Sequence, residues 1–329
     1  MPLLESRLPS PPPLLRNGHA ETLFAGLLRR PPKLDLERER LELPDGDFLD
    51  LDWSRSGSRR LALLTHGLEG HSRRPYVLGM AQALRDAGFD VLARNLRGCS
   101  GELNRLPTAY HSGETGDLDQ VLHHALARGG YESVVLVGFS IGGNQTLRYL
   151  GEDPDRVPGA VAASVCISVP CDLPSSEREL ARRSNRIYVL NFLKTLREKL
   201  REKNRRFPGL VDPERLEAVH DLHTFDDLFT APRHGFRDAA HYYVAASSRP
   251  VLGAIRVPTL VLNARNDPFL PLECFPEAEA RANPMLFLET PVLGGHVGFV
   301  PPRPGPYRSE TRAQEFLARV LGLPPAMRG

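Results

Sequence analysis

The sequence predicts an α/β protein with a mostly parallel central sheet, helices on both faces of the sheet and one inserted helical segment. From residue 61 onward, short apolar runs of strand length alternate with longer segments whose apolar residues recur at helical spacing. This alternation is typical of parallel strands joined by crossover helices. The composition agrees, because 41% of the 329 residues are hydrophobic and 25% are charged, as in a globular protein with a large core.

The segment before this pattern, residues 1–60, predicts an N-terminal extension that ends in a hairpin. Residues 36–43 and 48–53 have strand character, and the turn-forming sequence Pro44-Asp45-Gly46-Asp47 separates them. We expect this hairpin at an edge of the sheet.

The first part of the core is expected over residues 61–170. Its strands are predicted at 61–65, 89–95, 133–137 and 160–169, and its helices at 75–87, about 118–126 and 141–150. Pro75 suits the first turn of a helix, and Gly88 and the pair Gly129-Gly130 are typical helix ends.

The strand signal disappears between residues 171 and 256. This segment is rich in Arg, Glu and Asp, and its apolar residues over 187–200 have helical spacing. Strands resume at 259–263 and 285–288, and an amphipathic helix is expected over 309–321. The length alone favours roughly two domains, but this order predicts one core whose second part is 257–329. The helical insertion would lie over the carboxyl ends of the strands as a lid.

Charge and segment composition restrict the partners and the location of the protein. A formal net charge of +2 disfavours nucleic-acid binding. No secretory signal, no stretch long enough to span a bilayer and no disulfide framework is evident, so we predict a cytoplasmic protein. Within the lid, residues 194–206 are basic and 212–227 acidic, and the two are expected to pair. We favour a solvated helix for the basic part over weak peripheral contact with anionic lipid headgroups.

The pentapeptide Gly138-Phe139-Ser140-Ile141-Gly142 matches G-x-S-x-G and lies between a predicted strand and a predicted helix. A Ser at such an elbow projects its Oγ above the sheet, and the start of the helix supplies N–H groups for an oxyanion. A simple tight turn is the alternative; a phosphate-binding loop is disfavoured because its motifs are absent. We predict Ser140 as a nucleophile and the N–H of Ile141 as an oxyanion donor.

The partners of a nucleophile in this architecture follow in the order Ser, acid, His. Asp267 comes directly after the strand 259–263, although its sequence also fits an Asx turn, and Asp172 is a rival acid. His296 is framed by glycines and is the one His after His241. We predict that His296 takes the proton of the nucleophile and that Asp267 orients His296.

The loop after the strand 61–65 reads His66-Gly67-Leu68-Glu69-Gly70, and a second oxyanion donor is expected there. We favour the N–H of Leu68 and expect His66 to brace the loop without a role in proton transfer. We expect His220 and His223 to lie on the solvated surface and not to form a metal site, because no further ligand motif accompanies them. No cofactor and no metal are expected.

Seven ordered blocks of the sequence resemble the YheT-like branch of the α/β-hydrolases. These blocks are residues 17–23, 45–50, 66–70, 95–101, 138–144, 266–269 and 295–299. The resemblance implies an α/β-hydrolase fold and a carboxylesterase or acylglycerol lipase-like serine hydrolase, with Ser140, Asp267 and His296 as its catalytic triad. It implies small ester or lipid substrates with short to medium acyl chains. An acyltransferase that uses the same acyl-enzyme and a non-catalytic protein that binds a ligand in the same pocket stay open as alternatives.

Overall fold

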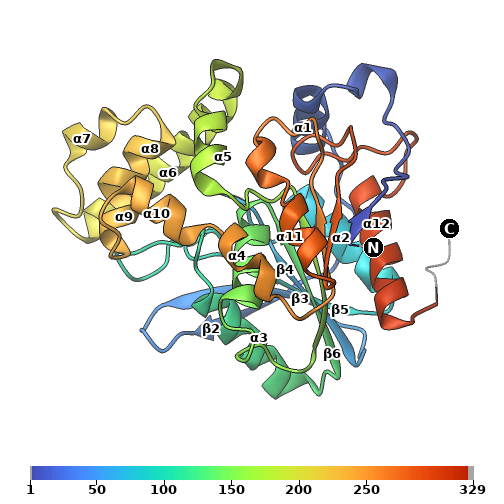
Figure 1. Cartoon of the computed structure of the whole chain (residues 1–329). Coiled ribbons are helices and arrows are strands. Elements are labelled where there is room, and N and C mark those ends of the chain that lie inside the picture. Colours follow the sequence, from blue (N-terminus) through green and yellow to red (C-terminus); the bar gives the residue numbers. More distant parts are fainter. Residues whose placement is uncertain (1, 325–329) are drawn as a thin grey trace.

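The computed structural model describes residues 2–324, which form a nine-stranded sheet with helices around it (Figure 1). Met1 and residues 325–329, the two ends of the predicted first and last segments, lie outside the described residues. The strand order is β1-β9-β8-β7-β6-β4-β5-β3-β2. The strands are β1 (Leu3–Leu4), β2 (Glu37–Glu42), β3 (Phe48–Ser54), β4 (Arg60–Thr65), β5 (Asp90–Arg94), β6 (Ser133–Phe139), β7 (Val161–Ile167), β8 (Thr259–Leu262) and β9 (Leu286–Glu289).

The directions of the strands confirm a mostly parallel sheet. Strands β4 to β9 pair in parallel with one another. Strand β3 pairs antiparallel with β5, and β2 and β3 form an antiparallel hairpin at one edge, as predicted. The sequence does not predict β1, which pairs in parallel with β9 at the opposite edge. Two residues are too short a run to carry a periodic signal.

Helices cover both faces of the sheet, as predicted. Successive strand residues point to opposite faces, so Leu61 and Leu63 of β4 belong to one buried cluster and Ala62 and Leu64 to the other. Helices α3 (Gly116–Gly129), α4 (Ile141–Glu152) and α11 (Glu277–Ala282) complete the first cluster, and α2 (Pro75–Asp86) and α12 (Arg308–Leu321) the second (Figure 1). The sheet is therefore buried between two layers.

Between β7 and β8 the described chain forms helices and no strand, and these helices gather on one side of the sheet (Figure 1). We call residues 171–256 the helical segment. Its helices include α5 (Leu173–Leu180), α6 (Arg186–Arg206), α7 (Pro213–Glu217), α8 (Leu222–Phe225), α9 (Ala231–Arg233) and α10 (Ala239–Ala246). Two buried clusters lie largely within the segment, one around Leu193 and Phe229 and one around Tyr242.

The charged halves of the helical segment pair less than expected. Arg201 forms an ion pair with Glu217, at 2.7 Å, whereas Arg205 and Arg206 pair with Glu202 of their own helix. The expectation of a solvated basic helix is wrong for the two lysines Lys199 and Lys203, because both turn toward the core.

Candidate active site

Ser140 lies at a sharp turn between β6 and α4. Its backbone has φ 53° and ψ −123°, a strained conformation for a residue other than glycine. A Cβ at Gly138 would lie 2.4 Å from the carbonyl oxygen of Gly142, and a Cβ at Gly142 would lie 2.4 Å from that of His66. Both glycines are therefore required by close backbone contacts, in agreement with the elbow that the sequence predicts.

The structure brings Ser140, His296 and Asp267 together. The Nε2 atom of His296 is 3.0 Å from the Ser140 Oγ, and its Nδ1 atom is 2.9 Å from Oδ2 of Asp267. A carboxylate only accepts hydrogen bonds, so Nδ1 carries the proton and Nε2 is free to accept one from Ser140. The rival Asp172 lies elsewhere, where it accepts from the N–H of Ser175 at the start of α5.

Three side chains outside the motifs that predict the triad hold the loop of His296. Asn266 Oδ1 accepts from the N–H groups of Gly294 and Gly295, at 2.9 and 3.0 Å. Thr22 Oγ1 accepts from the N–H of His296, and Ser168 Oγ from that of the next residue, both at 2.8 Å. Thr22 and Asn266 fall within the sequence blocks that carry the family resemblance, so the resemblance was the sequence feature that could have indicated their role.

The two expected oxyanion donors both lie close to Ser140. Ile141 follows Ser140 directly, and the Leu68 loop is close, because a Cβ at Gly67 would lie 3.0 Å from that of Ser140. Neither the N–H of Leu68 nor that of Ile141 has an acceptor among residues 2–324. Both groups can therefore donate to an oxygen that develops negative charge next to Ser140.

His66 braces this loop, as predicted. Its Nδ1 donates to the carbonyl of Gly67 at 2.7 Å, and its Nε2 accepts from the N–H of Leu96 at 3.1 Å. Burial lowers the pKa of His66 to about 3, so the ring stays neutral. His220 and His223, in contrast, are exposed on the helical segment.

Glu69, the residue after Leu68, ties the loop to the helical segment. Glu69 has φ 52°, and its Oε1 accepts from the hydroxyl of Tyr110 at 2.8 Å and from Nζ of Lys199 at 2.9 Å. Burial lowers the pKa of Lys199, but the neighbouring Cys99 and Glu69 outweigh it and raise the pKa. A protonated lysine of α6 therefore holds the loop that presents the Leu68 N–H.

We expect Lys199→Met to lower kcat for ester hydrolysis about tenfold. Loss of one oxyanion donor typically lowers kcat by about 10²–10³-fold, and this change loosens the loop without deleting the donor. Lys199→Arg should recover part of the loss. Steady-state kinetics check the result, with Lys194→Met on the exposed side of the same helix as the matched control. An equal effect of both methionine variants, or a change in KM alone, would contradict a positioning role for Lys199.

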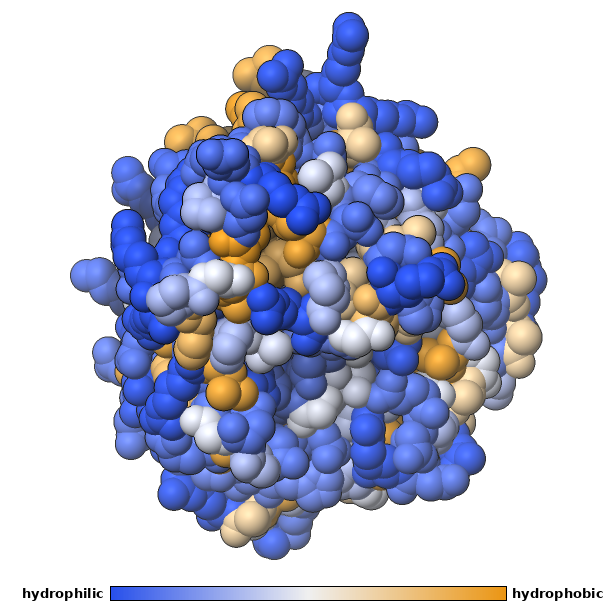
Figure 2. Space-filling view, turned by 90° about the vertical axis from the view of Figure 1, so that its left-hand side faces the viewer, coloured by the Kyte–Doolittle hydropathy of each residue, from blue (hydrophilic) through white to orange (hydrophobic). Residues whose placement is uncertain are grey.

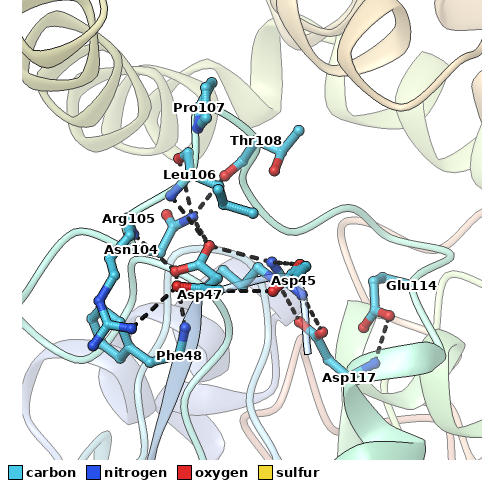
Figure 3. Close-up of polar contacts among 12 residues, drawn as sticks. Asp45, Asp47, Phe48, Asn104, Arg105, Leu106, Pro107, Thr108, Glu114 and Asp117 are labelled. Atoms are coloured by element: carbon cyan, nitrogen blue, oxygen red, sulfur yellow. Dashed lines mark hydrogen bonds and ion pairs between the residues drawn. The ribbon is translucent and has the colours of Figure 1, made fainter. Parts of the chain in front are cut away.

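A second lysine anchors α6 to the loop between β5 and α3. Lys203 Nζ donates to the carbonyl oxygens of Leu106 and Thr108, at 2.6 and 2.8 Å, and burial lowers its pKa to about 8. Figure 3 shows how Asp47 in turn holds this loop, since it accepts from the N–H of Arg105 and the side-chain amide of Asn104. The carboxylate of Asp47 in the N-terminal hairpin therefore supports the loop to which Lys203 of α6 is bound.

A cavity of about 520 Å³ lies above Ser140 and His296, within the range of about 300–1,000 Å³ that is typical of small-molecule pockets. Most of its lining is apolar or aromatic, and many of these side chains come from the helical segment. These residues include Leu173, Leu180, Tyr188, Phe192, Leu196, Leu200, Phe225, Phe229 and Tyr243. Figure 2 shows the side of the molecule on which the helical segment lies, where hydrophobic side chains reach the surface between hydrophilic ones. Among the described residues, no helix has the length and apolar character needed to cross a membrane.

Comparison with known proteins identifies the family. A family model described as "alpha/beta hydrolase fold" matches residues 63–211. The chain is 36% identical to the protein named "Putative esterase YheT" of Escherichia coli (strain K12), over 86% of this chain and 84% of that protein. It belongs to the YheT-like branch of the α/β-hydrolases. Phospholipase ABHD3 of Mus musculus is 29% identical over 86% of this chain and 71% of its own, and Monoacylglycerol lipase of Saccharomyces cerevisiae is 29% identical over 87% and 62%.

A solved structure supports the fold of this hydrolase. The esterase Pf2001 of Pyrococcus furiosus superposes with a TM-score of 0.61 and 17% identity, over 96% of this chain and 99% of that chain. The α/β-hydrolase fold with a mostly parallel sheet is therefore confirmed.

Proposed function

We propose that this protein is a serine hydrolase that cleaves carboxylic esters of short to medium acyl chains, with acylglycerols among the candidates. The observation that carries the proposal is the hydrogen-bonded series Ser140, His296 and Asp267 at the floor of an apolar cavity. The names of the relatives support an ester substrate, since they include an esterase, a phospholipase and a monoacylglycerol lipase.

In the proposed reaction, Ser140 Oγ attacks the ester carbonyl while His296 Nε2 takes its proton. The N–H groups of Leu68 and Ile141 stabilise the oxyanion that forms. The tetrahedral intermediate collapses to an acyl-enzyme, and His296 returns the proton to the leaving alcohol. Water then attacks the acyl-enzyme by the same route and releases the acid. Asp267 keeps the proton of the ring on Nδ1 and stabilises the imidazolium.

The helical segment is proposed to act as a lid. Its apolar side chains line the cavity, and Lys199 and Lys203 fasten it to the core. Such a cover excludes water from the acyl chain while the oxyanion donors act. The cytoplasmic location stays a prediction.

A panel of p-nitrophenyl esters tests this function. We expect kcat/KM to be highest for butyrate or octanoate and lower for palmitate, because a cavity of about 520 Å³ limits the chain that fits. Monoacylglycerols of the same chain lengths extend the panel. A parallel assay with added ethanol tests the acyltransferase alternative, which requires ethyl esters as the main product. Failure to hydrolyse any ester would favour the non-catalytic alternative.

A further inference from the structure

The cavity opens to solvent between α1 (Gly18–Leu27) and α6. Its exposed lining residues are Gly26 and Leu27 at the end of α1 and Ile187 and Asn191 at the start of α6, and we call these four residues the mouth. The mouth is close to the site of chemistry. Tyr188 contacts the ring of Phe269, and the centroid of that ring lies 4.2 Å from that of His296.

Exposed apolar side chains stand on both sides of the mouth. Leu27, the last residue of α1, and Leu28 after it are 76% and 67% exposed. Ile187 and Leu190 of α6 are 61% and 48% exposed. Single exposed leucines are ordinary, but apolar side chains gathered around the opening of an apolar cavity are typical of an interaction surface. We call these four side chains the rim.

The charge around the rim is one-sided. Neither residues 22–34 nor residues 180–197 contain Asp or Glu. Arg30, Arg183 and Arg186 are exposed, and none of them forms an ion pair with another residue of the described chain. An apolar surface with unpaired arginines next to it suits a partner that is apolar inside and anionic outside, as a layer of acidic lipid is.

We propose that the rim docks on an anionic lipid surface, so that substrate passes from lipid into the cavity through the mouth. The passage of an ester rests on the proposed function, whereas docking itself needs no catalysis. The contact lies away from the basic stretch 194–206, where Arg201 is paired with Glu217 and the two lysines turn inward. The proposed contact therefore lies at the start of α6 and does not involve the basic stretch, for which a solvated helix was the favoured prediction.

Co-sedimentation with vesicles tests the proposal, on the full chain with Ser140→Ala to prevent turnover. The protein is expected to bind vesicles of phosphatidylcholine with phosphatidylglycerol and to bind pure phosphatidylcholine weakly. R183E/R186E should lower the ratio of bound to free protein at least about tenfold, since each arginine at an anionic surface contributes about fivefold. L28S/L190S should also lower the ratio. The four substituted residues, Leu28, Arg183, Arg186 and Leu190, do not line the cavity.

Two matched controls carry the same chemical changes elsewhere. R205E/R206E reverses two charges at the other end of α6, and V244S/L272S changes two side chains that are 63% and 77% exposed. Both should leave vesicle binding unchanged. Equal losses in the controls, or binding that is indifferent to phosphatidylglycerol, would overturn the proposal. The proposal would also be overturned if the protein formed a dimer in the absence of vesicles and L28S/L190S dissociated it, because the rim would then bind a second copy of the chain. Hydrolysis of soluble p-nitrophenyl butyrate by the unsubstituted protein, which keeps Ser140, tests the proposed function separately.

Discussion

Ser140→Ala is expected to lower kcat for ester hydrolysis by at least about 10⁴-fold. The change removes the atom that would form the acyl bond. The thermal midpoint should stay nearly constant, because the Ser140 hydroxyl contacts His296 and supports no other described side chain. The oxyanion donors Leu68 and Ile141 are backbone groups and remain in place, so a small residual rate is expected.

Kinetics with p-nitrophenyl butyrate, labelling by a fluorophosphonate and calorimetry together check this result. The variant should lose both turnover and the label. Ser184→Ala, at an exposed serine, is the control and should keep both. A label that persists in Ser140→Ala would show that another residue is the nucleophile.

Asp267→Asn is expected to lower kcat by about 10⁴-fold, through the tautomer of His296. The N–H of Phe269 donates to Oδ1 of Asp267 at 2.9 Å, so an amide placed here keeps its oxygen at that position. Its NH₂ group then faces Nδ1 of His296 and donates to it. The proton of the neutral ring must move to Nε2, which can no longer accept the proton of Ser140.

The matched control is Asp172→Asn, at the rival acid. Asp172 caps α5 through Ser175, and Asn caps a helix as well as Asp does, so activity and stability should both be kept. Steady-state kinetics at neutral pH compare the two variants. If Asp172→Asn lost activity and Asp267→Asn kept it, the acid would be misassigned.

The parallel core and the G-x-S-x-G elbow were predictable because their signals are local. Strand runs, helix periods and helix-ending glycines each need only a short window of sequence. Asp267 and His296 were predicted from their order along the chain after successive strands, since parallel strands bring their carboxyl ends to one edge. β1 escaped prediction because only pairing with β9 makes two leucines a strand.

The supports of the site could not be derived from local signals. Thr22 lies 274 positions before His296 in the sequence, yet its hydroxyl holds the His296 backbone. Only the packing of α1 against the loop of Asp267 brings the two together, and that packing is tight, since a Cβ at Gly18 would collide with the carbonyl of Asn266.

The class of fold, the candidate triad and the place of the helical segment along the chain were predictable from the sequence alone. The tertiary structure decided which face each residue of that segment presents. Lys199 and Lys203 belong to a stretch that resembles a solvated basic helix, but α6 packs so that both reach buried acceptors of the core. The same packing of α6 leaves Ile187 and Leu190 exposed at the opening of the cavity. Helical spacing determines which residues share a face of α6, but only contacts with distant segments determine whether that face is buried or exposed.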